Sequence, residues 1–293
     1  MKIIEILING LNVGAIYAMI ALGYTMVYGI AKMLNFAHGD IIMVGGYTLC
    51  VTCALNGSPM FIFAAALIAV AVCTLLGVTV EKVAYKPLRG ASPLAVLITA
   101  IGVSYLLQSL AQIIFGSAAR RVSVPELGKF TLGALSIKYS TIITLAVTVL
   151  VMVALNLFVK YSKTGRAMIA VSEDKGAAQL MGINVNSIIT ITFAIGSALA
   201  ALAGLFYLLQ SPYITNTFGA MPGIKAFTAA VIGGIGSIPG AMVGSLLLGL
   251  IESVCDSIPV IAPYKDAIEF FILIVILLVR PTGLMGKKRR EKV

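Results

Sequence analysis

Charged residues are scarce in this chain, and their scarcity decides its class. Aspartate, glutamate, lysine and arginine make up 11% of the 293 residues, hydrophobic residues make up 60%, and the mean hydropathy is +1.05. A soluble domain carries roughly 25% charged residues. We therefore predict a polytopic membrane protein that lies in the lipid bilayer as a single domain, residues 1–293. Nucleic acid is not expected as a partner, despite the net charge of +10, because no basic stripe with interleaved aromatic residues is present.

Residues that commonly carry chemistry are equally rare. The single histidine, His38, excludes most histidine-dependent metal sites and the H-E-x-x-H motif. No G-x-S-x-G occurs, and the glycine-rich run 233–240 contains no lysine and has Pro239 in the last place of G-x-G-x-x-G, so it is neither of the common nucleotide-binding loops. The four cysteines lie in or beside apolar runs and are expected to be small core residues. The chain is therefore not predicted to be an enzyme, and no catalytic residue, metal or cofactor of its own is expected.

Apolar runs predict an all-α fold of about eight transmembrane helices plus broken or re-entrant segments near 31–46 and 227–254. The predicted spans are residues 6–29, 41–55, 60–80, 94–115, 139–159, 188–209, 227–254 and 267–279. Basic residues orient this bundle, since cytoplasmic loops carry an excess of lysine and arginine. With the basic tail 280–293 inside and 227–254 treated as an in-and-out hairpin, 14 of the 21 basic residues are cytoplasmic. The N-terminus is then external, and the polar loop 160–187 is cytoplasmic.

The first break lies in AKMLNFAHGD, residues 31–40, which interrupts the apolar pattern. The apolar run that follows, 41–55, has only 15 residues, whereas a helix needs about 20 to cross the hydrocarbon core. The backbone of residues 35–46 is therefore expected to be non-helical at membrane depth. Such a backbone is tolerated only where it is buried in protein or lines an aqueous cavity.

The second break lies in residues 227–254, which are too long for one straight span and too short for two. Glycines and Pro239 interrupt the middle of this run, so we expect a half-helix, an irregular turn and a longer helix. In the longer helix, Ala241, Ser245 and Gly249 form a face of small residues that permits tight helix packing.

One break in each half of the chain is typical of transporters that expose helix ends to a central path. The residues expected to line that path are Asn35, His38, Gly39, Asp40, Gly45, Gly46, Gly233, Gly234, Gly236 and Gly240. In the alternative interpretation, the glycines serve helix packing, and His38 and Asp40 lie at the membrane surface. For His38, a hydrogen bond to Asp40 or to nearby backbone is favoured over contact with a solute.

Two further groups of polar residues lie in or near the predicted spans. Gln108 and Gln112 are four residues apart, so their amides are expected to bond to a neighbouring helix, with the lining of a pore as the alternative. Lys265 and four acids near the outer ends of the last two spans are expected to meet water or an external partner. These acids are Glu252, Asp256, Asp266 and Glu269. No acid is evident at mid-membrane, which counts against a proton-driven carrier.

The polar loop 160–187 contains a short predicted helix. Ser172 is a favourable N-cap, and the carboxylates of Glu173 and Asp174 suit the positive end of the helix dipole. Gly182 lies where a C-terminal glycine is expected. The apolar face of this helix is formed by Ala177, Leu180 and Met181. The residues alone leave two functions open, docking on a partner or lying on the lipid headgroups.

Three separated motifs together resemble one family of transporters. Residues 9–47, with the core NFAHGD at 35–40, resemble the opening of the branched-chain amino-acid ABC transporter permeases, H-type subunit. AVIGGIGSIPGAMVGSLLLGLIE, residues 230–252, resembles the second signature of that family, and RPTGLMG near the end also fits. SEDKGAAQLMGIN, residues 172–184, resembles the coupling motif of ABC permeases. The resemblance covers essentially the whole chain.

The resemblance implies a membrane-spanning subunit of an ATP-driven importer for leucine, isoleucine and valine, in the inner membrane of a bacterium. The implied partners are a second, M-type permease, two cytoplasmic ATPases that bind the ATP, and a periplasmic or extracellular amino-acid-binding protein. The implied ATPase-coupling residues are Ser172, Glu173, Asp174, Ala177, Ala178, Leu180, Met181 and Gly182. This motif departs from the generic one, which has a glutamate directly before the alanine pair, so Glu173 and Asp174 are both candidates for the acid. A permease for another small solute of the same superfamily, a channel or secondary carrier without an ATPase, and a structural scaffold are the competing interpretations.

Overall fold

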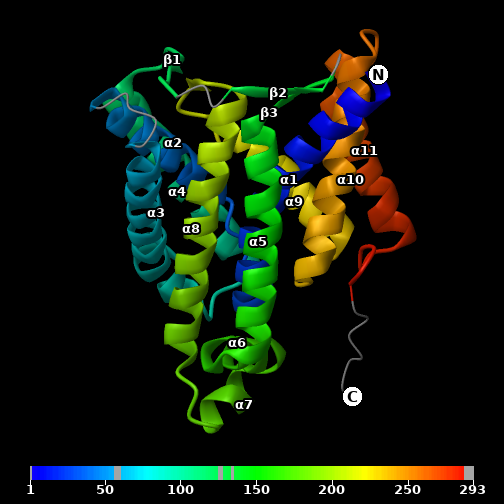
Figure 1. Cartoon of the computed structure of the whole chain (residues 1–293). Coiled ribbons are helices and arrows are strands. Elements are labelled where there is room, and N and C mark those ends of the chain that lie inside the picture. The colour runs from blue at the N-terminus through cyan, green and yellow to red at the C-terminus, as the bar shows by residue number, and fades with distance from the viewer. Residues whose placement is uncertain (1, 56–60, 125–127, 133–134, 287–293) are drawn as a thin grey trace.

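The computed structural model describes residues 2–55, 61–124, 128–132 and 135–286, which form a bundle of long helices (Figure 1). Seven helices in this part of the chain are long and apolar enough to cross a membrane. They are α1 (Lys2–Ala31), α2 (His38–Leu55), α3 (Phe61–Val80), α4 (Pro93–Phe115), α5 (Tyr139–Tyr161), α8 (Val185–Gln210) and α10 (Ile238–Ser257). Two shorter helices, α9 (Ala220–Gly233) and α11 (Lys265–Val279), pack against α10. The predicted all-α polytopic fold with about eight transmembrane helices is confirmed.

Helix α1 is the central element, because it packs against α5, α8, α9 and α10. Its glycines let α10 approach closely, since a Cβ added to Gly14 would lie 2.8 Å from the Cα of Leu246. The facing side of α10 is the predicted row of small residues. Ala241 and Ser245 are fully buried, and Gly249 lies against the backbone of Gly14. Small residues thus bring the two helix backbones together, as the sequence pattern predicted.

The first break is shorter than expected. Lys32, with a backbone φ of 59°, follows the last residue of α1, and residues 32–37 form the non-helical link to α2. The expectation of a non-helical backbone throughout 35–46 is wrong, because α2 already begins at His38. The polar residues at its start lengthen the apolar run into a helix of 18 residues, close to the length that a membrane span requires.

The second break has the predicted half-helix, turn and longer helix. Helix α9 ends at Gly233, and α10 begins at Ile238 with Ser237 as its N-cap. Between the two helices, Gly234 and Gly236 adopt φ values of 108° and 95°. Side chains strongly disfavour such conformations, so the glycines allow the chain to turn there.

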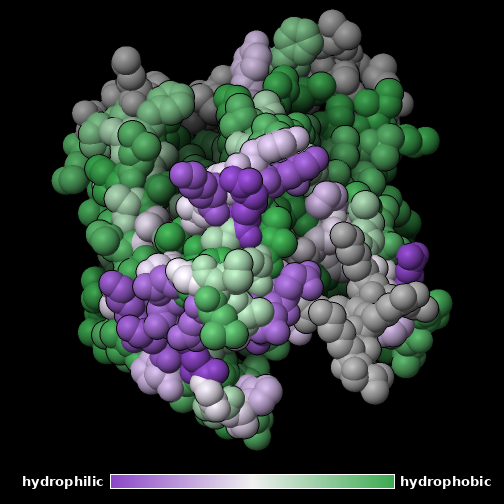
Figure 2. All heavy atoms as spheres, turned by 90° about the horizontal axis from the view of Figure 1, so that it is seen from below, coloured by the Kyte–Doolittle hydropathy of each residue, from purple (hydrophilic) through white to green (hydrophobic). Residues whose placement is uncertain are grey.

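The two ends of the bundle differ in structure. At the end where the chain begins, here called the hairpin end, β1 (Arg120–Arg121) pairs with β4 (Tyr213–Ile214), and β2 (Lys129–Leu132) pairs with β3 (Leu135–Lys138). At the opposite end, here called the α7 end, lie α6 (Lys163–Glu173) and α7 (Lys175–Leu180) (Figure 1). Figure 2, which views the α7 end, shows hydrophilic side chains gathered there with apolar surface around them. The N-terminal helix thus starts on the side opposite the loop 160–187, as the basic residues predicted.

Candidate functional site

The loop 160–187 folds into two short helices rather than one. The Ser162 hydroxyl oxygen accepts a hydrogen bond from the Gly165 N–H at 2.8 Å and caps α6. The prediction of Ser172 as an N-cap is wrong, because this residue lies inside α6, where its hydroxyl donates to the Ile169 carbonyl at 2.7 Å. The helix that precedes the predicted one therefore already includes the first residues of the coupling motif.

The predicted helix, α7, is capped at both ends. The Asp174 carboxylate accepts a hydrogen bond from the Ala177 N–H at 3.0 Å, so Asp174 is the N-cap. Of the two candidate acids, this one therefore fixes the start of α7, whereas Glu173 ends α6. Gly182 adopts a φ of 81° just beyond α7, which confirms the expected C-terminal glycine.

The apolar residues of α7 point in two directions. Ala178 is buried against α6 and α8 and anchors the helix to the bundle. The predicted apolar face points outward, with Leu180 and Met181 exposed over 91% and 82% of their surface. Large apolar side chains that project from a polar end of a protein commonly mark a contact with another molecule.

A further residue of α7, Lys175, was not among the predicted functional residues. Its Nζ donates a hydrogen bond to the carbonyl oxygen of Ala31, the last residue of α1, at 2.9 Å. Burial, together with the nearby charge of Arg89, lowers the pKa of the Lys175 ammonium group. The contact joins residues 144 positions apart, and no local pattern in the sequence signals it.

Helix α3 continues into a π-helical turn, η1 (Glu81–Tyr85), and a 3₁₀ turn, η2 (Lys86–Leu88). The fully buried carboxylate of Glu81 pairs with Arg89 and accepts a hydrogen bond from the Thr190 hydroxyl at 2.7 Å. Arg89 also donates to the side chain of Asn186. Asn186 and Thr190 both lie in the first turns of α8. These contacts therefore hold η1 against α8, the helix that follows α7.

Asn35, a predicted path residue, lies buried in the first break. Its side-chain oxygen accepts a hydrogen bond from the Tyr85 hydroxyl at 2.8 Å, and Tyr85 is fully buried as well. This contact ties the first break to the π-helical turn η1.

His38 and Asp40 are both buried inside the protein rather than exposed on its surface. The His38 imidazole packs edge-on against Tyr24, with ring centroids 4.6 Å apart, and its Nε2 has no hydrogen-bond partner among the described residues. The expected hydrogen bond of His38 stays a prediction. Asp40 accepts a hydrogen bond from Gln108 at 2.9 Å, so the first glutamine of α4 bonds to a neighbouring helix as predicted. The second glutamine of α4 is exposed.

The predicted path glycines near the first break lie in close helix contacts. A Cβ added to Gly39 would lie 2.5 Å from the carbonyl oxygen of Gly219, just before α9. Gly45 faces α3 and α8, and Gly46 faces β4 and the residues after it. Close packing, the alternative interpretation, accounts for all three glycines, and their place on a solute path stays a prediction.

The second break lies beside the last turn of α1, which leads into the first break. A Cβ added to Gly29 would lie 3.3 Å from the Cα of Gly236. Within the second break, Gly233 and Gly240 lie against each other's carbonyl groups, which holds the end of α9 to the start of α10. Residues from both halves of the chain are thus brought together, although Gly45 and Gly46 lie farther along α2.

The motif RPTGLMG has a structural role at the second break. Residues 281–286, here called the C-terminal strap, run back to the end of α9. The Leu284 and Met285 N–H groups donate to the carbonyls of Ile232 and Gly233 at 2.8 and 2.9 Å. The last carbonyls of a helix have no partner within it, so the strap satisfies two that would otherwise be unpaired.

A buried ion cluster between α1, α9, α10 and α11 corrects another expectation. Lys225 contacts the carboxylates of Glu252 at 2.9 Å, Asp266 at 2.7 Å and Glu269 at 3.4 Å. The Tyr17 hydroxyl donates to Glu252 at 2.6 Å. Lys225, Glu252 and Glu269 are buried, so the prediction that the acids meet water is wrong for these two glutamates. The two aspartates of the predicted group remain about half exposed.

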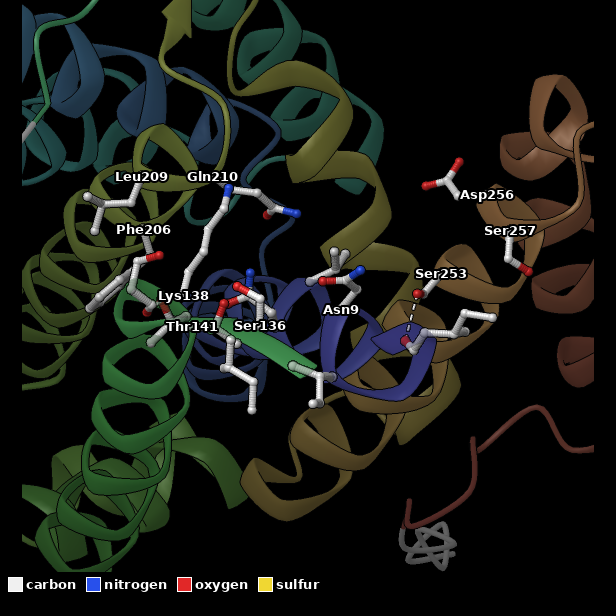
Figure 3. Close-up of a pocket in the computed structure, with 17 residues that line it drawn as sticks. Asn9, Ser136, Lys138, Thr141, Phe206, Leu209, Gln210, Ser253, Asp256 and Ser257 are labelled. Atoms are coloured by element: carbon white, nitrogen blue, oxygen red, sulfur yellow. Dashed lines mark hydrogen bonds between the residues drawn. The ribbon is translucent and has the colours of Figure 1, made fainter. Parts of the chain in front are cut away.

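A cavity of about 440 Å³ opens at the hairpin end between α1, α5, α8 and α10 (Figure 3). Its lining includes the amides of Asn9 and Gln210, the charged groups of Lys138 and Asp256, and the Phe206 ring. None of the predicted path residues lines this cavity. Polar groups that converge on an open recess of this size can hold water or a small polar solute.

The long apolar helices, the two interrupted segments and the capped helix at the polar end define a multi-pass membrane permease. The chain belongs to the family described as "Branched-chain amino acid transport system / permease component", whose model matches residues 6–277. This match confirms the family resemblance that the three motifs carry. The prediction of a multi-pass membrane protein of bacteria is confirmed as well.

Curated relatives match along nearly the whole chain. The chain is 45% identical over 300 residues to BraD, the high-affinity branched-chain amino acid transport system permease protein of Pseudomonas aeruginosa, covering 98% of this chain and 97% of the relative. It is 43% identical over 302 residues to the permease protein LivH of Escherichia coli, covering 97% and 96%. Among solved structures, PsaBC from Streptococcus pneumoniae in complex with Fab has a similar fold, with a TM-score of 0.50 and 13% identity over 94% of this chain and 91% of that one.

Proposed function

We propose that this chain is the membrane-spanning permease subunit of an ATP-driven importer for branched-chain amino acids. The printed names of its relatives support the solute class. The observation that carries the coupling role is the uncovered pair Leu180 and Met181 on a helix fixed by Asp174 and Gly182. A short capped helix with projecting apolar side chains suits insertion into a groove of a partner protein.

The partner of α7 in this proposal is a separate ATPase. The basic residues favour a cytoplasmic α7 end, where ATP is available. The sequence contains no phosphate-binding loop, so ATP is bound and hydrolysed by two partner subunits. A second, M-type permease and a periplasmic or extracellular binding protein complete the importer.

The solute path in this proposal passes the two breaks, and the second of them lies against the last turn of α1, where Gly29 meets Gly236. The residues of the breaks are packed tightly in this conformation. The breaks are therefore closed to a solute here, whereas the cavity at the hairpin end, which none of the path residues lines, is open. ATPase closure at α7 would have to loosen the contacts around the breaks before a solute could pass.

Copurification tests the docking role of α7. The tagged chain, extracted from its native membrane in a mild detergent, is expected to bring down an ATPase identified by its mass and its ATP hydrolysis. Leu180→Asp combined with Met181→Asp is expected to lose the ATPase, because charged side chains cannot enter an apolar groove without a large desolvation cost. The variant chain should still insert into the membrane, since both side chains are exposed.

The matched control is Val260→Asp, which changes a similarly exposed apolar residue in the turn after α10. This variant should retain the ATPase. Retention of the ATPase by the α7 variant, or its loss from both variants, would contradict docking through α7.

A secondary carrier that needs no ATPase is the second candidate, and one observation favours it. The buried Glu269 faces Lys225 at 3.4 Å, but neither of its carboxylate oxygens has a hydrogen-bond partner among the described residues. Ionisable groups buried among membrane helices are used by proton-driven carriers. Purified chain in vesicles with an imposed pH gradient distinguishes the two, because leucine uptake without ATP or ATPase would establish the carrier.

A further inference from the structure

We propose that Lys175 and Tyr85 transmit movement of α7 to the first break, residues 32–37, and thereby couple the ATPase to the solute path. This inference rests on the proposed function, because it takes α7 as the helix that docks on the ATPase. Neither residue belongs to the exposed face of α7 or to the predicted path. Both are positioning residues, which act through the groups that they hold.

The direct route joins the first residue of α7 to the last residue of α1. Lys175 opens α7, and its Nζ lies 2.9 Å from the carbonyl oxygen of Ala31. A carbonyl at the end of a helix lacks a partner within that helix, and the φ of 59° at Lys32 turns the chain away from α1 directly afterwards. Lys175 supplies the donor, and a charged donor makes a stronger hydrogen bond than a neutral one. Displacement of α7 therefore pulls on the end of α1.

The indirect route runs through α8 and the π-helical turn η1. Thr190, near the start of α8, donates to Glu81 at 2.7 Å, and Arg89 pairs with the same carboxylate. Tyr85 lies in the same turn as Glu81 and donates to Asn35 at 2.8 Å. π-Helical turns occur frequently at functional sites, where they interrupt the regular helix ladder. This route reaches the first break at Asn35, four residues after Ala31.

Both routes end in the same short stretch, one at Ala31 and the other at Asn35. Residues 32–37 are not helical, so the angle between α1 and α2 can change there without breaking a helix. A shift of α2 would then displace the start of α9, because Gly39 of α2 packs directly on Gly219, the residue before α9. Tightly packed elements move as rigid bodies rather than deform, so the two contacts can carry a displacement over this distance.

The complete importer in proteoliposomes, with its ATPases, second permease and binding protein, allows ATP hydrolysis and leucine uptake to be measured together. We expect Lys175→Met and Tyr85→Phe each to raise the ATP hydrolysed per leucine imported by about 3- to 10-fold, the extent to which network residues typically modulate coupling. Tyr85→Phe keeps the ring that packs against Phe193, so it removes only the hydroxyl.

Two further variants separate transmission from general damage. Lys175→Arg keeps a charged donor and is expected to restore most of the wild-type ratio. Lys163→Met removes an exposed lysine of the neighbouring helix α6 and is the matched control, with no expected change in the ratio. A ratio raised equally by all four variants would overturn the inference.

The remaining outcomes distinguish this inference from the proposed function. A wild-type complex without ATP-dependent leucine uptake would overturn the proposed function itself. Unchanged ratios in Lys175→Met and Tyr85→Phe, with normal assembly and uptake, would overturn the inference and leave the proposed function standing. Loss of the ATPase from the Lys175→Met complex would also overturn it, because Lys175 would then act in docking rather than in transmission.

Discussion

At the scale of single residues, two lysines show how differently a partly dehydrated charge can be used. Lys225 neutralises carboxylates from α10 and α11 in the interior of the bundle. Lys175 holds a single backbone carbonyl near the surface of the α7 end. A buried charge must be paired, whereas a partly exposed one can return to water. We therefore expect Lys225 to be required for folding and Lys175 to be dispensable for it.

The first prediction concerns the stability of the buried ion cluster. Lys225→Met is expected to lower the free energy of unfolding by about 3–5 kcal/mol, because it leaves Glu252 and Glu269 buried without their closest countercharge. Denaturant or thermal unfolding of the purified chain in detergent measures the loss. The control is Lys265→Met, which removes a more exposed partner of Glu252 and should cost at most about 1 kcal/mol. Equal losses in the two variants would contradict a central role for Lys225.

Neither lysine could be identified from the sequence, because each acts over a long separation. Lys225 and Glu252 are 27 positions apart and lie on different helices, and Lys175 and Ala31 are 144 positions apart. Periodicity reports only which face of a helix is apolar, not which helix lies opposite. The residue roles that the sequence did predict, such as the C-terminal glycine Gly182, depend on backbone within a few positions.

At the scale of elements, α7 is defined by its ends rather than by its length. Gly182→Val is expected to reduce leucine uptake about tenfold, because a β-branched residue is strained in the left-handed conformation. No atom lies within 4 Å of a Cβ added there, so the effect acts through the backbone alone. Uptake of labelled leucine by cells, normalised to the amount of the chain in the membrane, measures it.

Gly182→Asn is the matched control, since asparagine tolerates the left-handed conformation better than other side chains. It should retain most of the uptake and the same amount of protein in the membrane. Equal transport by Gly182→Val and Gly182→Asn would contradict a requirement for the left-handed backbone conformation at the end of α7.

The membrane helices were largely predictable, and the exceptions have physical causes. Apolar run length predicted the spans, and a cluster of glycines predicted the second break. The start of α2 was missed because its polar residues are satisfied by distant partners, such as Gln108 for Asp40. Helix α6 was missed because it has only 11 residues and its apolar run, 167–171, is too short to be recognised as a span in a polar loop. Contacts between distant residues thus determine the helix boundaries that the local sequence pattern does not predict.

At the scale of the whole molecule, the two ends of the bundle differ in how tightly they are packed. The hairpin end has an open cavity, whereas the breaks nearer the α7 end are closed by glycine contacts. An importer must alternate between such arrangements, so the closed region should open when the ATPases change state. The difference between the ends can be measured by chemical access.

The third prediction uses Ala37→Cys, which places a thiol at a fully buried position in the first break and leaves the bond between Asn35 and Tyr85 intact. In the complete importer, its reaction with a water-soluble thiol reagent is expected to be slow at rest. The reaction should quicken at least about tenfold when the ATPases are trapped with a nonhydrolysable nucleotide, since an open state must be populated for reagent to enter.

Asn9→Cys is the comparison, because Asn9 lines the open cavity at the hairpin end and should react readily at rest. The unmodified chain sets the background, as three of its four cysteines are buried and Cys50 is partly buried. Equal protection of the Ala37→Cys thiol in every state would favour packing as the sole role of the first break.

The C-terminal strap also determines the order in which this chain can be completed. Leu284 and Met285 pair with Ile232 and Gly233 only after residue 285 has left the ribosome, more than 50 residues after the end of α9. Until then the end of α9 has open carbonyls, which lipid cannot satisfy. A subunit released early by a premature stop would contain its central helices in place but an unfinished second break. Two hydrogen bonds that form late in synthesis thus decide whether the second break is finished.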